Sequence, residues 1–180
     1  MNEHYGAVAR GFHWAMALLV LLALALGEVM TELPVSPQRL EIYSYHKWVG
    51  VTVLGLVLVR LLWRLAHRPP ALPAGVPLWE QRVAHVTHWV LYLLMFLVPL
   101  SGWLMSSAKG FPVVYLGIWQ LPDMLGKDKA LGHLLENVHA VLANGLLTLV
   151  GLHVAAALKH HFIDRDDVLA RMVPHLRRKG

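Results

Sequence analysis

Cysteine is absent from this chain of 180 residues, so disulfides, iron–sulfur clusters and thiolate metal ligands are excluded. Charge is also scarce, because Asp, Glu, Lys and Arg make up only 15% of the residues where an average soluble domain has about 25%. Hydrophobic residues make up 57%, and the mean hydropathy is +0.51. This composition excludes an ordinary soluble domain and indicates an integral membrane protein.

Long apolar stretches account for this composition. We expect membrane helices at about residues 12–30, 46–66, 86–106 and 135–158, each long enough to cross the hydrocarbon core. The first stretch contains Ala23-Leu24-Ala25, which is also typical of a signal-peptide cleavage site, but we interpret it as part of a membrane helix. The predicted fold is all-α, an integral membrane four-helix bundle in which residues 1–180 form a single membrane domain.

Lysine and arginine are distributed unequally between the connections. By the positive-inside rule, both termini are expected in the cytoplasm and the long connection 106–132 outside. A connection of this length is usually functional or lies across a surface. Because the cations flank apolar segments, we attribute the net charge of +5 to membrane orientation and not to nucleic-acid binding. The cytoplasmic group is Arg10, Arg60, Arg64, Arg68, Arg82, Lys159, Arg165, Arg171, Arg177, Arg178 and Lys179, and the outer group is Arg39, Lys47, Lys109, Lys127 and Lys129.

Several of the 12 histidines stand inside apolar stretches. His139 and His153 belong to the last predicted helix, where a separation close to four turns projects both from nearly the same face, about 21 Å apart. The predicted orientation puts His46 at the same outer level as His139. It puts His13 at the same inner level as His153, with His88 as a competitor for that partnership. The sequence therefore predicts two histidine pairs, each joining two helices.

Imidazoles at these depths are costly and tend to be functional, and neutral imidazole is a strong metal ligand. Two histidines alone make a poor tetrahedral zinc site, but two trans histidines suit haem, whose porphyrin supplies the other four nitrogens. Facing helices of a bundle hold such ligands around a cofactor. Without a Cys-Xaa-Xaa-Cys-His motif, the haem is non-covalent, as in a b-type cytochrome. Small residues expected to make room for it are Gly50, Gly55, Ala140, Ala143, Gly145 and Gly151.

The remaining histidines are expected at helix ends, where they bond carbonyl groups or face lipid headgroups. His85 has the same interpretation, whereas His88 stays open as a haem ligand at this point. The residues expected at helix ends are His4, His67, His133, His160, His161 and His175.

Seven short segments, spread over nearly the whole chain, resemble the bacterial cytochrome b561 family. The resemblance implies a four-helix bundle with two b haems, the inner one held by His13 and His153 and the outer one by His46 and His139. It thereby favours His13 over His88. The segments are Phe12-His13-Trp14, Tyr45-His46-Lys47, Val59-Arg60-Leu61-Leu62-Trp63-Arg64, Ala84-His85-Val86-Thr87-His88, Val138-His139, Leu152-His153 and Lys159-His160-His161-Phe162.

Within that family the chain is most similar to short, free-standing members of the bacterial inner (plasma) membrane that oxidise superoxide and reduce ubiquinone. The resemblance implies an oxidoreductase that takes electrons from superoxide at the outer face, without an obligatory protein partner. The outer cations named above are expected to steer the superoxide anion, or else to be solvated or paired with haem propionates. Neither a catalytic residue nor a quinone pocket has a recognisable signature.

Two other functions are compatible with the pattern. One is a haem-bearing relay subunit between the quinone pool and a partner dehydrogenase or hydrogenase. The other is a histidine-based proton or metal transporter, which would lack a visible spectrum.

Overall fold

The computed structural model describes residues 5–67, 70 and 75–176. Within them, four long helices follow one another: α1 (Ala7–Glu32), α2 (Pro37–Ala66), α3 (Leu78–Ala108) and α4 (Lys129–Lys159). Each is long and apolar enough to cross a membrane, which confirms the predicted all-α membrane bundle. The predictions made for His4, Arg68, Arg177, Arg178 and Lys179 lie outside the described residues.

The helices are longer than the apolar stretches that predicted them. α2 begins at Pro37, well before His46, because Ser36 caps it by accepting a hydrogen bond from the Arg39 amide (3.2 Å) and proline suits the first helical position. Asp128 caps α4 in the same way through the amide of Leu131 (3.0 Å). His46 is therefore not at the start of its helix but about two and a half turns inside it.

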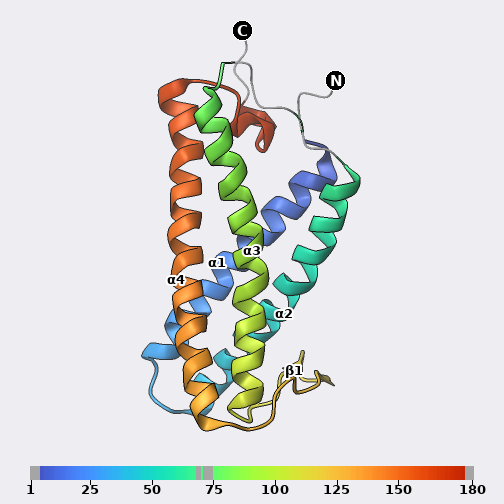
Figure 1. Ribbon diagram of the computed structural model, residues 1–180, viewed down its shortest axis with the longest axis vertical. Coiled ribbons are helices and arrows are strands. Elements are labelled where there is room, and N and C mark those ends of the chain that lie inside the picture. The colour runs from blue at the N-terminus through green and yellow to red at the C-terminus, as the bar shows by residue number, and fades with distance from the viewer. Residues whose placement is uncertain (1–4, 68–69, 71–74, 177–180) are drawn as a thin grey trace.

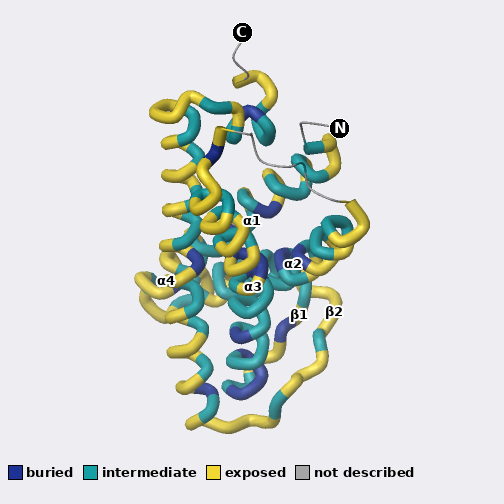
Figure 2. The backbone as a smooth tube through the Cα atoms, turned by 45° about the horizontal axis from the view of Figure 1, so that its top comes forward, coloured by how far each residue is buried: buried dark blue, intermediate teal, exposed yellow. Residues whose placement is uncertain are grey.

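Each helix packs beside the next one in the chain, α1 on α2, α2 on α3 and α3 on α4. Many large apolar residues outside the core are exposed, and Figure 2 shows exposed segments along the outside of the helices. Outward apolar faces are expected where lipid is the solvent. The buried core cluster draws on all four helices and consists of Met16, Val20, Val53, Val57, Leu91, Tyr92, Met95 and Leu146.

The bundle has two distinct ends (Figure 1). The hairpin end carries the turn 33–36 between α1 and α2, the connection 109–128 and the first turn of α4. The terminal end carries the start of α1, the end of α2, the start of α3 and the segment after α4.

A small β-hairpin lies in the connection between α3 and α4. Its strands β1 (Val114–Tyr115) and β2 (Trp119–Gln120) are antiparallel, with Tyr115 opposite Trp119. Figures 1 and 2 show the hairpin beside α2. The indole nitrogen of Trp48 donates to the Val114 carbonyl at 2.7 Å, so this long connection packs on the bundle instead of extending freely from it.

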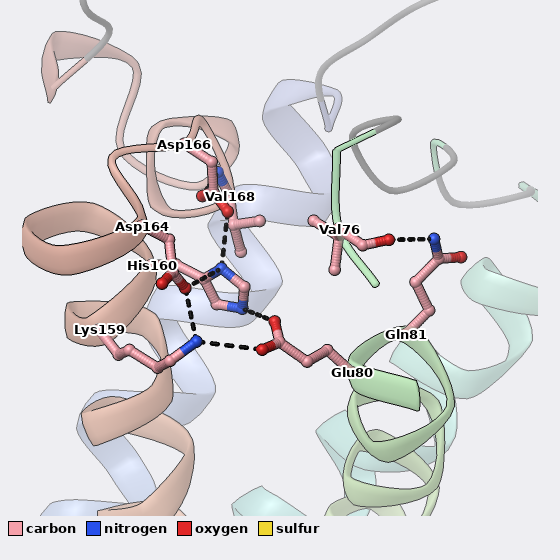
Figure 3. A network of polar contacts seen from close by, with 8 residues as sticks. All are labelled: Val76, Glu80, Gln81, Lys159, His160, Asp164, Asp166 and Val168. Carbon is pink, nitrogen blue, oxygen red and sulfur yellow. Dashed lines mark hydrogen bonds and ion pairs between the residues drawn. The ribbon is translucent and has the colours of Figure 1, made fainter. Parts of the chain in front are cut away.

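At the terminal end, α4 continues into a π-helical turn, η1 (His160–Asp164), followed by the 3₁₀ turns η2 (Leu169–Arg171) and η3 (Pro174–Leu176). A polar network ties this segment to the first turn of α3 (Figure 3). The Lys159 ammonium lies 3.1 Å from Glu80 Oε1 and 2.7 Å from Asp164 Oδ2.

His160 belongs to the same network, with Nδ1 2.7 Å from Asp166 Oδ2. The expectation that its ring bonds a carbonyl or faces headgroups was wrong, because the reversal of the chain after η1 brings a carboxylate to it. Glu80, His160 and Asp164 offer three potential ligand atoms within 4.8 Å of one another. The Lys159 ammonium already forms an ion pair with each of the two carboxylates, so we interpret this network as a structural link between α3 and the segment after α4.

Candidate functional site

The structure brings the predicted histidines together as two pairs. At the hairpin end, the ring centres of His46 on α2 and His139 on α4 are 6.2 Å apart, with their planes at 89°. Toward the terminal end, those of His13 on α1 and His153 on α4 are also 6.2 Å apart, with their planes at 63°. α4 is thus the helix common to both pairs.

The common separation of 6.2 Å fits two imidazoles bound to opposite sides of one iron. With a metal–nitrogen distance of about 2.0 Å and about 1.15 Å from nitrogen to ring centre, two imidazoles on opposite sides of a metal would stand about 6.3 Å apart, centre to centre. Two rings in direct hydrogen-bond or stacking contact would be closer. The donor set, two imidazole nitrogens on apolar helices, would suit a b-type haem.

The ring of His46 is held from α1. Its Nδ1 lies 2.9 Å from the carbonyl oxygen of Ala23, so Nδ1 carries the proton and Nε2 keeps a free lone pair. A Cβ atom on Gly27 would lie 3.3 Å from Cε1 of the ring. Glycine at this position therefore both makes room for the imidazole and uncovers the carbonyl one turn before it.

The ring of His139 is held from α3 by the same arrangement. Its Nδ1 lies 3.0 Å from the Val98 carbonyl oxygen and 3.0 Å from Ser101 Oγ, which itself donates to the Val98 carbonyl at 2.7 Å. A Cβ atom on Gly102 would lie only 3.0 Å from Cε1 of the ring. A carbonyl acceptor that fixes the tautomer and raises the basicity of the ligand is typical of metal-binding histidines.

Sequence reasoning missed both of these glycines. It selected glycines on the same helices as the ligands, but among the described residues no atom lies within 4 Å of a Cβ built on Gly55, Gly145 or Gly151. The glycines in contact with the rings, Gly27 and Gly102, belong to the neighbouring helices. In both cases the glycine stands four residues after the residue whose carbonyl accepts the hydrogen bond. The sequence shows only a glycine within an apolar helix, which is too common to indicate a contact with a histidine.

The terminal-end pair has a different neighbour. Nδ1 of His13 lies 3.4 Å from Nη2 of Arg60, a long contact that brings a guanidinium cation beside the imidazole. Arg60 also contacts Sδ of Met16 at 3.7 Å and lies 5.2 Å above the ring of Tyr92. Arg60 was expected only as a cation flanking the membrane, but the structure turns it inward to the histidine.

A third histidine lies in this group. The ring centre of His88 on α3 is 5.5 Å from that of His153, with the planes at 69°. The structure therefore keeps His88 as a neighbour of the terminal-end pair. His85, one turn earlier, accepts a hydrogen bond from the Trp89 indole at 3.1 Å and is exposed, so it lies outside the group.

Several cations of the hairpin end already contact other protein groups. Lys109 forms an ion pair with Glu136 at 2.7 Å, and Lys47 donates to the Phe111 carbonyl at 3.3 Å. Arg39 stacks on Tyr43 of its own helix, 5.6 Å from the ring centre. A surface pocket at this end collects three of the lysines and is lined by Ala108, Lys109, Phe111, Lys127, Asp128, Lys129 and His133.

Comparison with known proteins identifies a family and several relatives. The family model of prokaryotic cytochrome b561 matches residues 4–175. The chain is 35% identical to cytochrome b561 homolog 2 of Escherichia coli strain K12, over 95% of this chain and 92% of that protein. It is 33% identical to the probable superoxide oxidase CybB of Yersinia pestis, over 98% and 99% of the two chains.

The matched region includes all four membrane-capable helices and both histidine pairs. The family implies a b-type haem and electron transfer, and together with the four helices it indicates a bacterial membrane protein. With its bundle, its paired imidazoles and relatives over its whole length, the chain belongs to the prokaryotic cytochrome b561 family.

Proposed function

We propose that this chain oxidises superoxide to dioxygen at the hairpin end and passes the electrons along the bundle to ubiquinone. Two superoxide anions each lose one electron and leave as dioxygen, and one ubiquinone takes up the two electrons with two protons to give ubiquinol. In this proposal His13 and His153 hold one b-type haem, and His46 and His139 hold a second. When bound, the haems supply the one-electron steps between donor and acceptor.

The observation that carries the proposal is the equal spacing of the two pairs, 6.2 Å at each end of α4. This equal spacing supports two cofactor sites of the same kind, one for each histidine pair, and not a single cofactor site. The His88–His153 separation of 5.5 Å is shorter than the roughly 6.3 Å of trans imidazoles around a metal. This difference favours His13 as the partner of His153.

The choice of superoxide rests on two supports. A relative with 33% identity over nearly both whole chains is named a probable superoxide oxidase. At the hairpin end, lysines gather around one pocket, and positive charge there would raise the local concentration of an anionic substrate. With the positive-inside rule, the proposal has the hairpin end outside, both termini in the cytoplasm and the chain in the inner membrane.

An optical spectrum with haem quantitation of the purified protein tests the cofactor sites. We expect two haems per chain, and one in His139→Ala. Fewer than two haems in the parent protein, or an unchanged spectrum in that variant, would contradict the four-ligand arrangement.

Mixing the oxidised protein with superoxide, with and without ubiquinone, tests the substrate. We expect superoxide to reduce the haems and ubiquinone to reoxidise them. If superoxide fails to reduce them, the chain is better described as a relay subunit, and co-purification with a larger redox protein would then support that function.

A further inference from the structure

The hairpin lies at a boundary between polar and apolar sequence. Lys47 is the last charged residue of α2 before the uncharged run 48–59, so Trp48 marks the start of the apolar part of the helix. The hairpin is attached at this level, through Trp48 to the Val114 carbonyl (2.7 Å) and one turn deeper through Thr52 Oγ1 to the Tyr115 hydroxyl (3.0 Å). It is therefore beside the membrane-spanning part of α2 and not beyond its end.

The surface of the hairpin is apolar. Residues 110–122 contain no Asp, Glu, Lys or Arg. Leu116, Ile118 and Trp119 form the tip and are 53%, 88% and 67% exposed. Large apolar side chains exposed together at a turn are unfavourable in water and mark an interaction surface.

The backbone of the turn gives a second, independent indication. Leu116 has φ of +54° and Gly117 has φ of +72°, the combination of a type I′ turn, in which asparagine or aspartate followed by glycine is preferred. A leucine in this left-handed region costs on the order of 1 kcal/mol. Asparagine or aspartate would fit this backbone conformation better. We therefore infer that the Leu116 side chain is needed for a contact outside the protein.

We propose that the hairpin is an interfacial membrane anchor whose tip residues Leu116, Ile118 and Trp119 insert into the lipid leaflet at the hairpin end. The occupant is lipid because the hairpin is level with the start of the apolar run of α2. Tryptophan beside aliphatic residues is the composition found at the headgroup boundary. Burying the tip there offsets the strain of Leu116.

The anchor acts close to the hairpin-end histidine pair. Trp48, which holds the hairpin, is two residues beyond His46 on α2. Gly117 lies near the same indole, because a Cβ built on it would be 3.9 Å from Trp48 Cζ2. Lipid held at the tip therefore steadies the turn of α2 that carries His46.

A spin label on Ile118→Cys tests the anchor, because the native chain has no cysteine and each variant carries one thiol. The protein with its cofactors, in bilayer nanodiscs, is exposed to dioxygen, which concentrates in lipid, and to a neutral nickel chelate, which stays in water. Asp123→Cys, exposed on the same connection outside the hairpin, is the matched control. We expect the dioxygen-to-nickel collision ratio to be several-fold higher at position 118 than at position 123.

Equal ratios at the two positions would overturn the proposal. So would strong spin–spin broadening at position 118, because it would identify a second copy of this chain as the occupant.

Leu116→Asn, combined with the label at position 118, separates anchoring from folding. Asparagine tolerates the left-handed conformation, so thermal stability in detergent should be unchanged or higher while the collision ratio at position 118 falls toward that of the control. A ratio that stays high would show that Leu116 has no part in insertion and would refute its role in the anchor.

Discussion

Nη2 of Arg60 lies 3.4 Å from Nδ1 of His13. In the described part of the chain, no carbonyl oxygen is hydrogen-bonded to this nitrogen, whereas Nδ1 of His46 and Nδ1 of His139 each meet a carbonyl within 3.0 Å. A carbonyl acceptor makes an imidazole more electron-donating, and a nearby cation disfavours the more positive oxidised state. Under the proposed ligation, the terminal-end site should therefore have the higher reduction potential and draw electrons from the hairpin end.

Replacing Arg60 with methionine should lower the reduction potential of the terminal-end haem. The variant removes the cation beside His13 but keeps an apolar stem, and we expect a decrease of about 60 mV, a tenfold change in a one-electron equilibrium. A potentiometric titration followed in the visible spectrum measures it.

Arg64→Met is the control for that titration. Arg64 stacks on the same Tyr92 ring, 5.5 Å from its centre, one turn further along α2. Its replacement should change the potential much less. If both variants shift the potential equally, the effect belongs to the general field of the helix end and not to the Arg60–His13 contact.

Alanine at the two carbonyl-exposing glycines should impair the hairpin-end site to different degrees. A Cβ would stand 3.0 Å from the ring of His139 in Gly102→Ala but 3.3 Å from the ring of His46 in Gly27→Ala. We expect Gly102→Ala to lose most of one haem and Gly27→Ala to lose less, by haem quantitation. Gly11→Ala is the control, since among the described residues nothing lies within 4 Å of its Cβ position. A full complement of haem in Gly102→Ala would contradict the role given to this glycine.

The terminal-end ligands can be separated by comparing His13→Ala with His88→Leu. We expect one haem per chain in the first variant and two in the second, because the 6.2 Å spacing of His13 and His153 suits trans ligation. Haem quantitation and the low-temperature spectrum of the reduced protein distinguish the two cases. The opposite pattern, with loss only in His88→Leu, would assign His88 as the ligand.

Removing positive charge from the hairpin-end pocket should slow the reaction with superoxide in a salt-dependent manner. In Lys127→Gln/Lys129→Gln, we expect the rate of haem reduction to fall about three- to tenfold at low ionic strength and the difference to shrink as salt is raised. Arg82→Gln/Arg171→Gln removes the same charge at the terminal end and should leave the rate unchanged. Equal slowing by both double variants would exclude local steering.

The bundle and the histidine pairs were predictable because the bilayer leaves few choices. Long uncharged stretches must be helices, and helix direction then assigns a depth to every histidine they contain. The helix ends were less predictable. Pro37 and Asp128 belong to polar segments, and their helices extend there because of capping, which hydropathy does not report.

The second layer of the site could not be predicted for a related reason. Gly27 and Gly102 are important because each faces a histidine on another helix. Which side of a helix faces its neighbour depends on side-chain packing between helices, and a single sequence does not reveal that packing. Arg60 was missed because a cation near a helix end already has a sufficient explanation in membrane topology. Its contact with His13 distinguishes it from Arg64.

One consequence follows from the presence of both His139 and His153 on the unbroken helix α4. A single residue inserted between them would turn one imidazole by about 100° relative to the other and dismantle one pair while leaving the hydropathy profile unchanged. Seven inserted residues would nearly restore the phase, yet would lengthen the electron path by about 10 Å, far enough to slow tunnelling by orders of magnitude. This segment should therefore accept many substitutions but almost no change of length.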